Sequence, residues 1–198
     1  MDWLSIWIHP RQVTERALQK GYGRHILWLI ILGNFAQTAT REANRNLGDD
    51  HSTGYVLFAI LIAALISVPL TLYIVAPLLR WTGSWLGGQG DTDDIRIAFA
   101  YGSIPMIWTL PVLLADYALL GEKMFQSSLT MPTEPFALMV FLLLTILKVI
   151  MVVWGIVVFL NAIAAAHRFS GGRALLCCII PGFILILVVI LLTVVASL

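Results

Sequence analysis

Two charged side chains inside apolar stretches are the residues best suited to chemistry. Lys148 lies within the apolar run 135–166, and Asp116 lies within the run 95–120. A lysine at the centre of a bilayer costs about 2.5–3.5 kcal/mol, so it needs a partner or access to water. An ion pair between two helices would suit an ion site, a proton site or a switch. The alternative is a lysine that extends to the interface and a separately solvated aspartate.

Counting along the chain places both residues at the same depth. The interval from Lys148 to Arg168 equals the interval from Arg96 to Asp116. At about 1.5 Å per helical residue, each side chain lies about 30 Å from the boundary that its arginine marks. The count therefore predicts Lys148 and Asp116 as an intramembrane pair between the third and fourth apolar helices, provided that the fourth is unbroken.

Other polar clusters have simpler interpretations. Asp91, Asp93 and Asp94 come just before an apolar run, where carboxylates cap free N–H groups and interact favourably with the helix dipole. Their spacing does not match a calcium-binding loop. Ser103 lacks the sequence context of a nucleophile, and no His-Glu-x-x-His pattern occurs in the chain. We therefore expect no catalytic residue, no metal site and no cofactor.

The elements that must position these residues are membrane helices. Of the 198 residues, 60% are hydrophobic and only 12% are charged, whereas soluble domains carry about 25% charged residues. Five apolar runs reach or approach the roughly 20 residues that a membrane span requires. They cover about 26–39, 55–79, 95–120, 135–166 and 174–198. The sequence therefore predicts an all-α, polytopic membrane protein with five transmembrane helices, and its net charge of +1 gives no reason to expect a nucleic-acid partner.

Residues 1–24 form a distinct segment before the five-helix domain of residues 25–198. Trp3 and Trp7 open it, Pro10 suits the first turn of a helix, and basic residues follow with apolar residues on one face. We expect an amphipathic helix at the membrane surface, with the tryptophans in the headgroup layer. The alternative is an unstructured leader.

The distribution of positive charge gives an orientation. With five spans and a cytoplasmic N-terminus, the inner segments hold 8 lysines and arginines and the outer segments hold 3. If the first apolar run did not span, the two sides would hold 7 and 4. Positive residues concentrate on the cytoplasmic side of membrane proteins, so the five-span arrangement is favoured. It places the N-terminus inside and the C-terminus outside.

Four short motifs are spaced along nearly the whole chain: His9-Pro10-Arg11, Gly87-Gly88-x-Gly90, Ala100-Tyr101-Gly102-Ser103-Ile104-Pro105, and Arg173-Ala174-Leu175 with Pro181. The positions of most interest in them are Pro10, Arg11, Gly87, Gly88, Tyr101, Gly102, Pro105, Arg173 and Pro181. In this order, the motifs resemble the Yip family, the Ypt/Rab-interacting protein domain, and in particular its short bacterial members.

The resemblance implies a five-span fold with a cytoplasmic N-terminus, and for a bacterial member it implies the inner membrane. The sequence departs from eukaryotic members in one respect. Only the short segment 1–24 precedes the first apolar run, and the Asp-Leu-Tyr-Gly-Pro motif of those members is absent. We therefore do not expect binding to Rab GTPases.

Two functions are compatible with these features. The first is a non-enzymatic membrane-organising or interaction protein that contacts membrane lipids, a protein partner or a second copy of itself. The second is a small transporter or channel that acts as an oligomer. Transport is compatible with the sequence because helices broken by proline expose backbone groups that bind ions. Pro69, Pro77, Pro105 and Pro111 interrupt the second and third runs and favour the second function.

Overall fold

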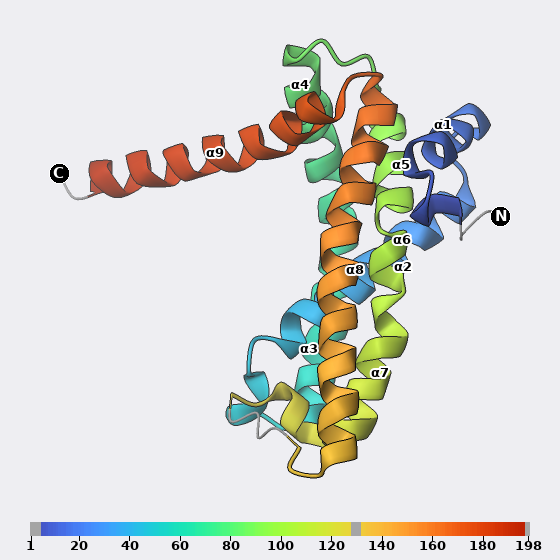
Figure 1. The fold of residues 1–198 in the computed structure, drawn as a ribbon. Coiled ribbons are helices and arrows are strands. Elements are labelled where there is room, and N and C mark those ends of the chain that lie inside the picture. Colours follow the sequence, from blue (N-terminus) through green and yellow to red (C-terminus); the bar gives the residue numbers. More distant parts are fainter. Residues whose placement is uncertain (1–4, 128–131, 197–198) are drawn as a thin grey trace.

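The computed structural model describes residues 5–127 and 132–196 and is all-helical over that part of the chain (Figure 1). Three helices in it are long and apolar enough to cross a membrane: Thr53–Trp85, Thr92–Phe125 and Pro135–His167. The predicted class, an all-α membrane protein, is therefore confirmed.

Two further helices pack with these three or extend from them. α2 (Arg24–Ala43) contains polar and charged residues, and α9 (Gly171–Ala196) begins with the apolar segment Gly171–Ile184. The structure therefore supports three of the five expected spans on length and composition. In Figure 1, α9 leaves the bundle at one end and runs away from the other helices.

The N-terminal segment contains a short 3-10 turn (Ser5–Trp7) and α1 (Pro10–Lys20), whose first residue is the proline expected at a helix start. Val13, Thr14 and Ala17 are buried where α1 packs against α8 (Pro135–His167) and α5 (Thr92–Gly102). α1 is therefore fixed to one end of the bundle. Trp3, expected in the headgroup layer, lies outside the described residues.

The third apolar run is the centre of the bundle and is broken twice. It forms α5, α6 (Ile104–Ile107) and α7 (Thr109–Leu120), followed by a 3-10 turn (Gly121–Phe125). Pro105 supplies no N–H for a regular helix, so the chain turns at Ser103. The Ser103 hydroxyl donates to the Ala100 carbonyl oxygen at 2.9 Å, which satisfies one acceptor beside the break.

Close backbone contacts hold the helices around this break. Gly33 of α2 faces Ser103, and Gly155 of α8 faces the side chain of Met106. A Cβ atom on Gly102 would lie 2.7 Å from Phe159 Cδ2 and 3.1 Å from its Cα. Small residues allow such an approach between membrane helices, where dispersion contacts provide much of the attraction.

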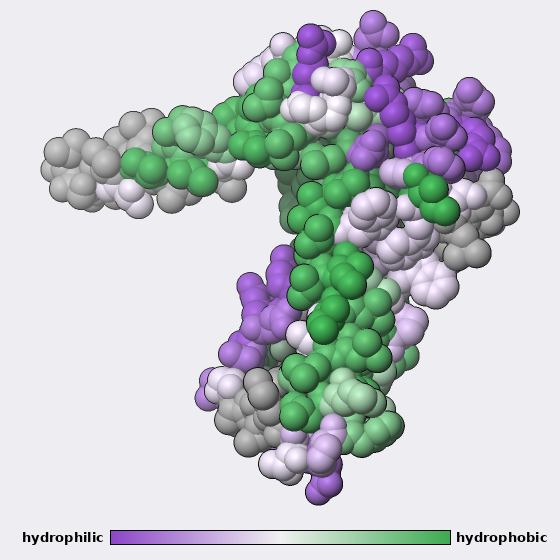
Figure 2. Space-filling view, viewed as in Figure 1, coloured by the Kyte–Doolittle hydropathy of each residue, from purple (hydrophilic) through white to green (hydrophobic). Residues whose placement is uncertain are grey.

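The two ends of the bundle differ in charge. α1, the start of α2, the α4–α5 turn and the α8–α9 turn form one end, which we call the basic end (Figure 1). It carries Arg11, Arg16, Lys20, Arg24, Arg80, Arg96, Arg168 and Arg173. Figure 2 shows hydrophilic residues at both ends and a hydrophobic band over the helices between them.

The second apolar run forms α3 (Thr53–Leu70), a π-helical turn (Thr71–Val75) and α4 (Ala76–Trp85). In the π turn, the Ala76 N–H bonds to the Thr71 carbonyl, five residues back. The corresponding donor for the Leu72 carbonyl would be Pro77, which has no N–H. Arg96 replaces it: Nε and Nη2 donate to the Leu72 oxygen at 3.1 and 3.0 Å.

Arg96 is held in place by its neighbours. Nη1 donates to Asp93 Oδ1 at 2.7 Å, and Cζ lies 5.4 Å from the Tyr73 ring centroid and 6.0 Å from that of Tyr22. Partial burial raises the pKa of Tyr22 above its ordinary value, although the Arg96 charge opposes this shift. The cap formed by Asp91 and Asp94 begins the same helix, as predicted for these carboxylates.

We predict that Arg96→Met lowers the free energy of unfolding by about 1–3 kcal/mol, because the Leu72 carbonyl then lacks its donor. Thermal melting in detergent measures the change. Pro77→Ala restores an N–H at the position where the π turn needs it. The double variant should therefore melt above the value expected from adding the two single effects. Strict additivity would contradict this assignment.

Candidate functional site

The predicted intramembrane residues lie together. Lys148 of α8 and Asp116 of α7 form an ion pair, with Lys148 Nζ donating to Asp116 Oδ2 at 2.7 Å. The Asp116 side chain is only 1% exposed, and that of Lys148 is 29% exposed. α8 runs without a break from Pro135 to His167, which is the condition on which the residue count depended.

One oxygen of this pair is unsatisfied. Asp116 Oδ1 is buried and has no hydrogen-bond partner among the described residues. Removing a carboxylate from water is expensive, and a single lysine with one short contact offsets only part of that cost. The pair therefore links α7 to α8, while its remaining oxygen is an acceptor suited to a proton or a cation.

A buried histidine explains the glycines at the end of α4 and in the α4–α5 turn. Cβ atoms added to Gly83, Gly88 or Gly90 would all approach the His167 ring or the adjacent backbone, so glycine is needed at each position. His167 is 1% exposed, and its Nε2 lies 3.3 Å from the Leu79 carbonyl oxygen. The turn is thereby fixed against the last residue of α8.

The motif positions have structural roles in several parts of the fold. Tyr101 lines a cavity, and Gly102 and Pro105 lie at the contact of the third apolar run with α8. Arg11 of α1 pairs with Glu15 at 3.0 Å. The other positions are placed as follows: Pro10 begins α1, Gly87 adopts φ +82° in the α4–α5 turn, Gly88 contacts His167, and Arg173 and Pro181 lie in α9.

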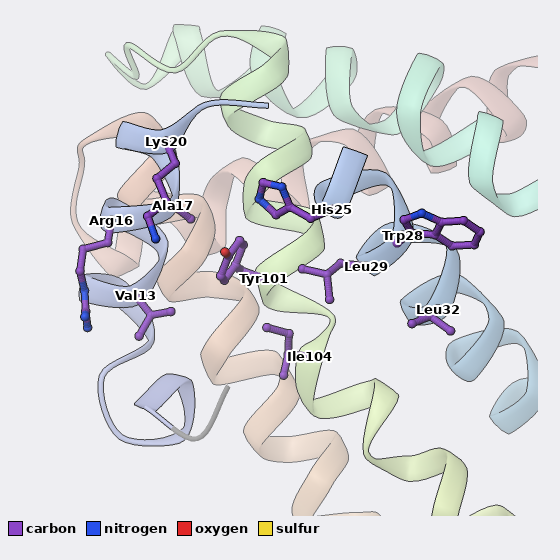
Figure 3. A pocket seen from close by; sticks show the side chains of 10 residues that line it. All are labelled: Val13, Arg16, Ala17, Lys20, His25, Trp28, Leu29, Leu32, Tyr101 and Ile104. Atoms are coloured by element: carbon purple, nitrogen blue, oxygen red, sulfur yellow. The ribbon is translucent and has the colours of Figure 1, made fainter. Parts of the chain in front are cut away.

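A cavity of about 370 Å³ opens between α1 and α2 at the basic end (Figure 3). Arg16 and Lys20 of α1 and His25 of α2 lie at its edge, and Tyr101 projects into it from α5. Apolar side chains complete its wall: Val13, Ala17, Trp28, Leu29, Leu32 and Ile104. This cavity was not predicted from the sequence, because its lining residues come from four separate helices.

A smaller cavity of about 210 Å³ lies between α2, the α5–α6 break and α8. Asn34, Gln37 and Ser103 supply its polar groups. Asn34 Oδ1 accepts a hydrogen bond from Thr71 Oγ1 at 3.0 Å, so one of these amides already binds a neighbouring helix. Within the described residues, no group of three histidine, cysteine or acidic side chains is arranged to hold a metal ion.

A family model described as the Yip1 domain matches residues 4–193 of the chain. No curated protein and no solved structure gave a significant match. The matched range includes α1, the α4–α5 turn, the Lys148–Asp116 pair and both cavities.

We predict that Lys148→Leu lowers the free energy of unfolding by about 3 kcal/mol, because Asp116 loses its only charged partner among the described residues. Thermal melting in detergent measures this loss. Adding Asp116→Asn removes the stranded charge, so the double variant should recover part of the stability. Equal melting temperatures for wild type and Lys148→Leu would show that the pair does not contribute.

We also predict that Gly88→Ala lowers the free energy of unfolding by about 1–3 kcal/mol through overpacking. Its Cβ would lie 2.5 Å from His167 Nδ1 and 2.8 Å from the Gly83 carbonyl oxygen. Gly172→Ala is the matched control, since a Cβ there meets no atom within 4 Å. Melting curves that fall equally for both variants would contradict the role given to His167.

Proposed function

Because the chain belongs to the Yip1 domain family, we propose that it is a non-enzymatic membrane protein that organises membrane or binds a protein or lipid partner. The interaction surface is the basic end of the bundle. The single observation that carries this proposal is the position of α1. This helix packs on α5 and α8 through Val13, Thr14 and Ala17, so its exposed side chains lie together at one end of the bundle.

The proposed topology has five spans in a bacterial inner membrane, with the N-terminus inside and the C-terminus outside. α2 has 20 residues and α9 has 26, which correspond to about 30 and 39 Å of helix. Eight lysines and arginines belong to the basic end and three, Arg41, Arg45 and Lys123, to the opposite end. The positive-inside rule then supports a cytoplasmic basic end.

The alternative function is a small transporter or channel that acts as an oligomer. The buried, partly unsatisfied carboxylate of Asp116 favours it, as does the smaller cavity with its polar groups Asn34 and Gln37. Against it stands the apolar exterior of α3 and α8, which leaves few polar residues to line a path through one copy.

Photo-crosslinking in cells tests the interaction surface. We predict that a benzoyl-phenylalanine at Gln12 or Gln19, both exposed on α1, yields a discrete crosslinked protein or lipid species. The same probe at Glu122, exposed at the opposite end, is the matched control. An equal crosslinking pattern at all three positions would contradict a surface specific to the basic end.

Ion flux from proteoliposomes separates the two functions. The interaction proposal expects no flux of protons, sodium, potassium or chloride above that of protein-free vesicles. Flux by the wild type that both Asp116→Asn and Lys148→Leu abolish would replace the interaction proposal with the transporter, since these two side chains form the intramembrane pair.

A further inference from the structure

We propose that the cavity between α1 and α2 binds one anionic glycerophospholipid. Its headgroup phosphate would lie at Lys20 and His25, and an acyl chain would follow the apolar face of α2. This inference rests on the proposed function, because it specifies the ligand that the basic end would take from the membrane.

The charge of the cavity selects an anion. Its ionisable lining comprises Arg16, Lys20, His25 and Tyr101, with no carboxylate among the described residues that line it. Lys20 and His25 form no ion pair or hydrogen bond within the described parts of the chain. Arg16 Nε donates to the backbone oxygen of Gln12 at 3.3 Å, which places its guanidinium along α1 at the cavity edge.

A fourth donor lies deeper in the cavity. In Figure 3, the rings of His25 and Tyr101 both project into the space between α1 and α2. Tyr101 is half-buried, and its hydroxyl has no hydrogen-bond partner among the described residues. A phosphate oxygen that accepts from Lys20 could also accept from such a hydroxyl, since a phosphate group offers several strong acceptors.

The apolar part of the wall distinguishes a lipid from a soluble phosphate. Leu29 is buried beneath the cavity, while Leu32 is 41% exposed and Trp28 is 60% exposed along the same side of α2. A lipid would cover this surface with its acyl chain, whereas an inorganic phosphate would leave it exposed. Tryptophan is also enriched at the depth where headgroups meet acyl chains.

The size and position of the cavity agree with this ligand. Its volume of about 370 Å³ lies within the range of about 300–1,000 Å³ typical of small-ligand sites. It opens at the basic end between α1 and the start of α2 (Figure 1), and the exposed side chains of Trp28 and Leu32 continue its apolar wall along α2 (Figure 3). A lipid in the adjacent leaflet would therefore reach it without leaving the membrane.

Native mass spectrometry of the full chain in detergent tests the site. Dioleoyl phosphatidylglycerol and dioleoyl phosphatidylcholine are titrated separately, and the first 1:1 lipid adduct is measured. We expect a preference for the anionic lipid, and Lys20→Gln should weaken its binding about fivefold, the effect of about 1 kcal/mol per basic residue. Leu32→Trp, which keeps every charge but fills the cavity, should weaken both lipids.

Arg80→Gln is the matched control, because Arg80 is exposed at the basic end but does not line the cavity. It should leave lipid binding unchanged, and melting curves check that each variant is folded. Inorganic phosphate at millimolar concentration should not displace the lipid. Displacement by phosphate would assign the site to a soluble anion and overturn the lipid.

Two further outcomes would overturn the inference. Equal binding of the two lipids would exclude recognition of the headgroup charge, and equal weakening by Arg80→Gln and Lys20→Gln would indicate diffuse attraction instead of a cavity. Either outcome would leave the crosslinking at Gln12 and Gln19 unaffected. A failure of this inference is therefore distinguishable from a failure of the proposed function.

Discussion

The close approach of α5 to α8 is the contact on which the rest of the bundle depends. It requires Gly102 of α5 against the backbone of Phe159 in α8, and beside it Gly155 of α8 faces the side chain of Met106 in α6. Because these two helices are held close together, α1 can pack across both at one end, and Asp116 can reach Lys148 toward the other. The fold thus uses small residues to fix its centre, and the polar contacts occur where that centre has already aligned the helices.

Counting residues at a constant rise predicted Lys148 beside Asp116, and that rise applies to α8, which is unbroken. The interval from Arg96 to Asp116 crosses the breaks at Ser103 and Trp108, which the count did not include. Counting was not sufficient for Arg96 or His167. The hydrogen bond from the Arg96 side chain to the Leu72 carbonyl oxygen depends on a π turn, and the spacing of apolar residues does not predict such a turn. The glycines around His167 were visible in the sequence, but the ring that they accommodate belongs to a helix that begins far beyond them in the chain.

The composition of α2 limits how well this helix can be recognised as a membrane span. The three apolar helices recognised by length in the structure coincide with predicted runs, since their polar residues are few. α2 carries Glu42, which is 3% exposed and pairs with Arg45 at 3.3 Å. A charge satisfied by its own helix neighbours lowers the hydropathy of the segment without preventing its burial. Hydropathy alone therefore does not identify α2 as a span, and the cavity beside α2 could not be predicted from one segment because other helices complete its lining.

The π turn at Thr71–Val75 also sets the rotational register between α3 and α4. One residue corresponds to about 100° of rotation in an α-helix, so the extra residue lets the two halves of this long helix face different neighbours. Two residues of α4 contact the neighbouring helices. The Thr82 hydroxyl donates to the Cys177 carbonyl oxygen of α9 at 3.2 Å, and the Leu79 carbonyl oxygen lies 3.3 Å from Nε2 of His167 in α8. A chain shortened by one residue at the π turn would keep a continuous helix but turn these groups away from α8 and α9. The number of residues in this segment therefore fixes the rotation of α4 relative to α3. The fold accommodates a point substitution in the segment more readily than the deletion of one residue.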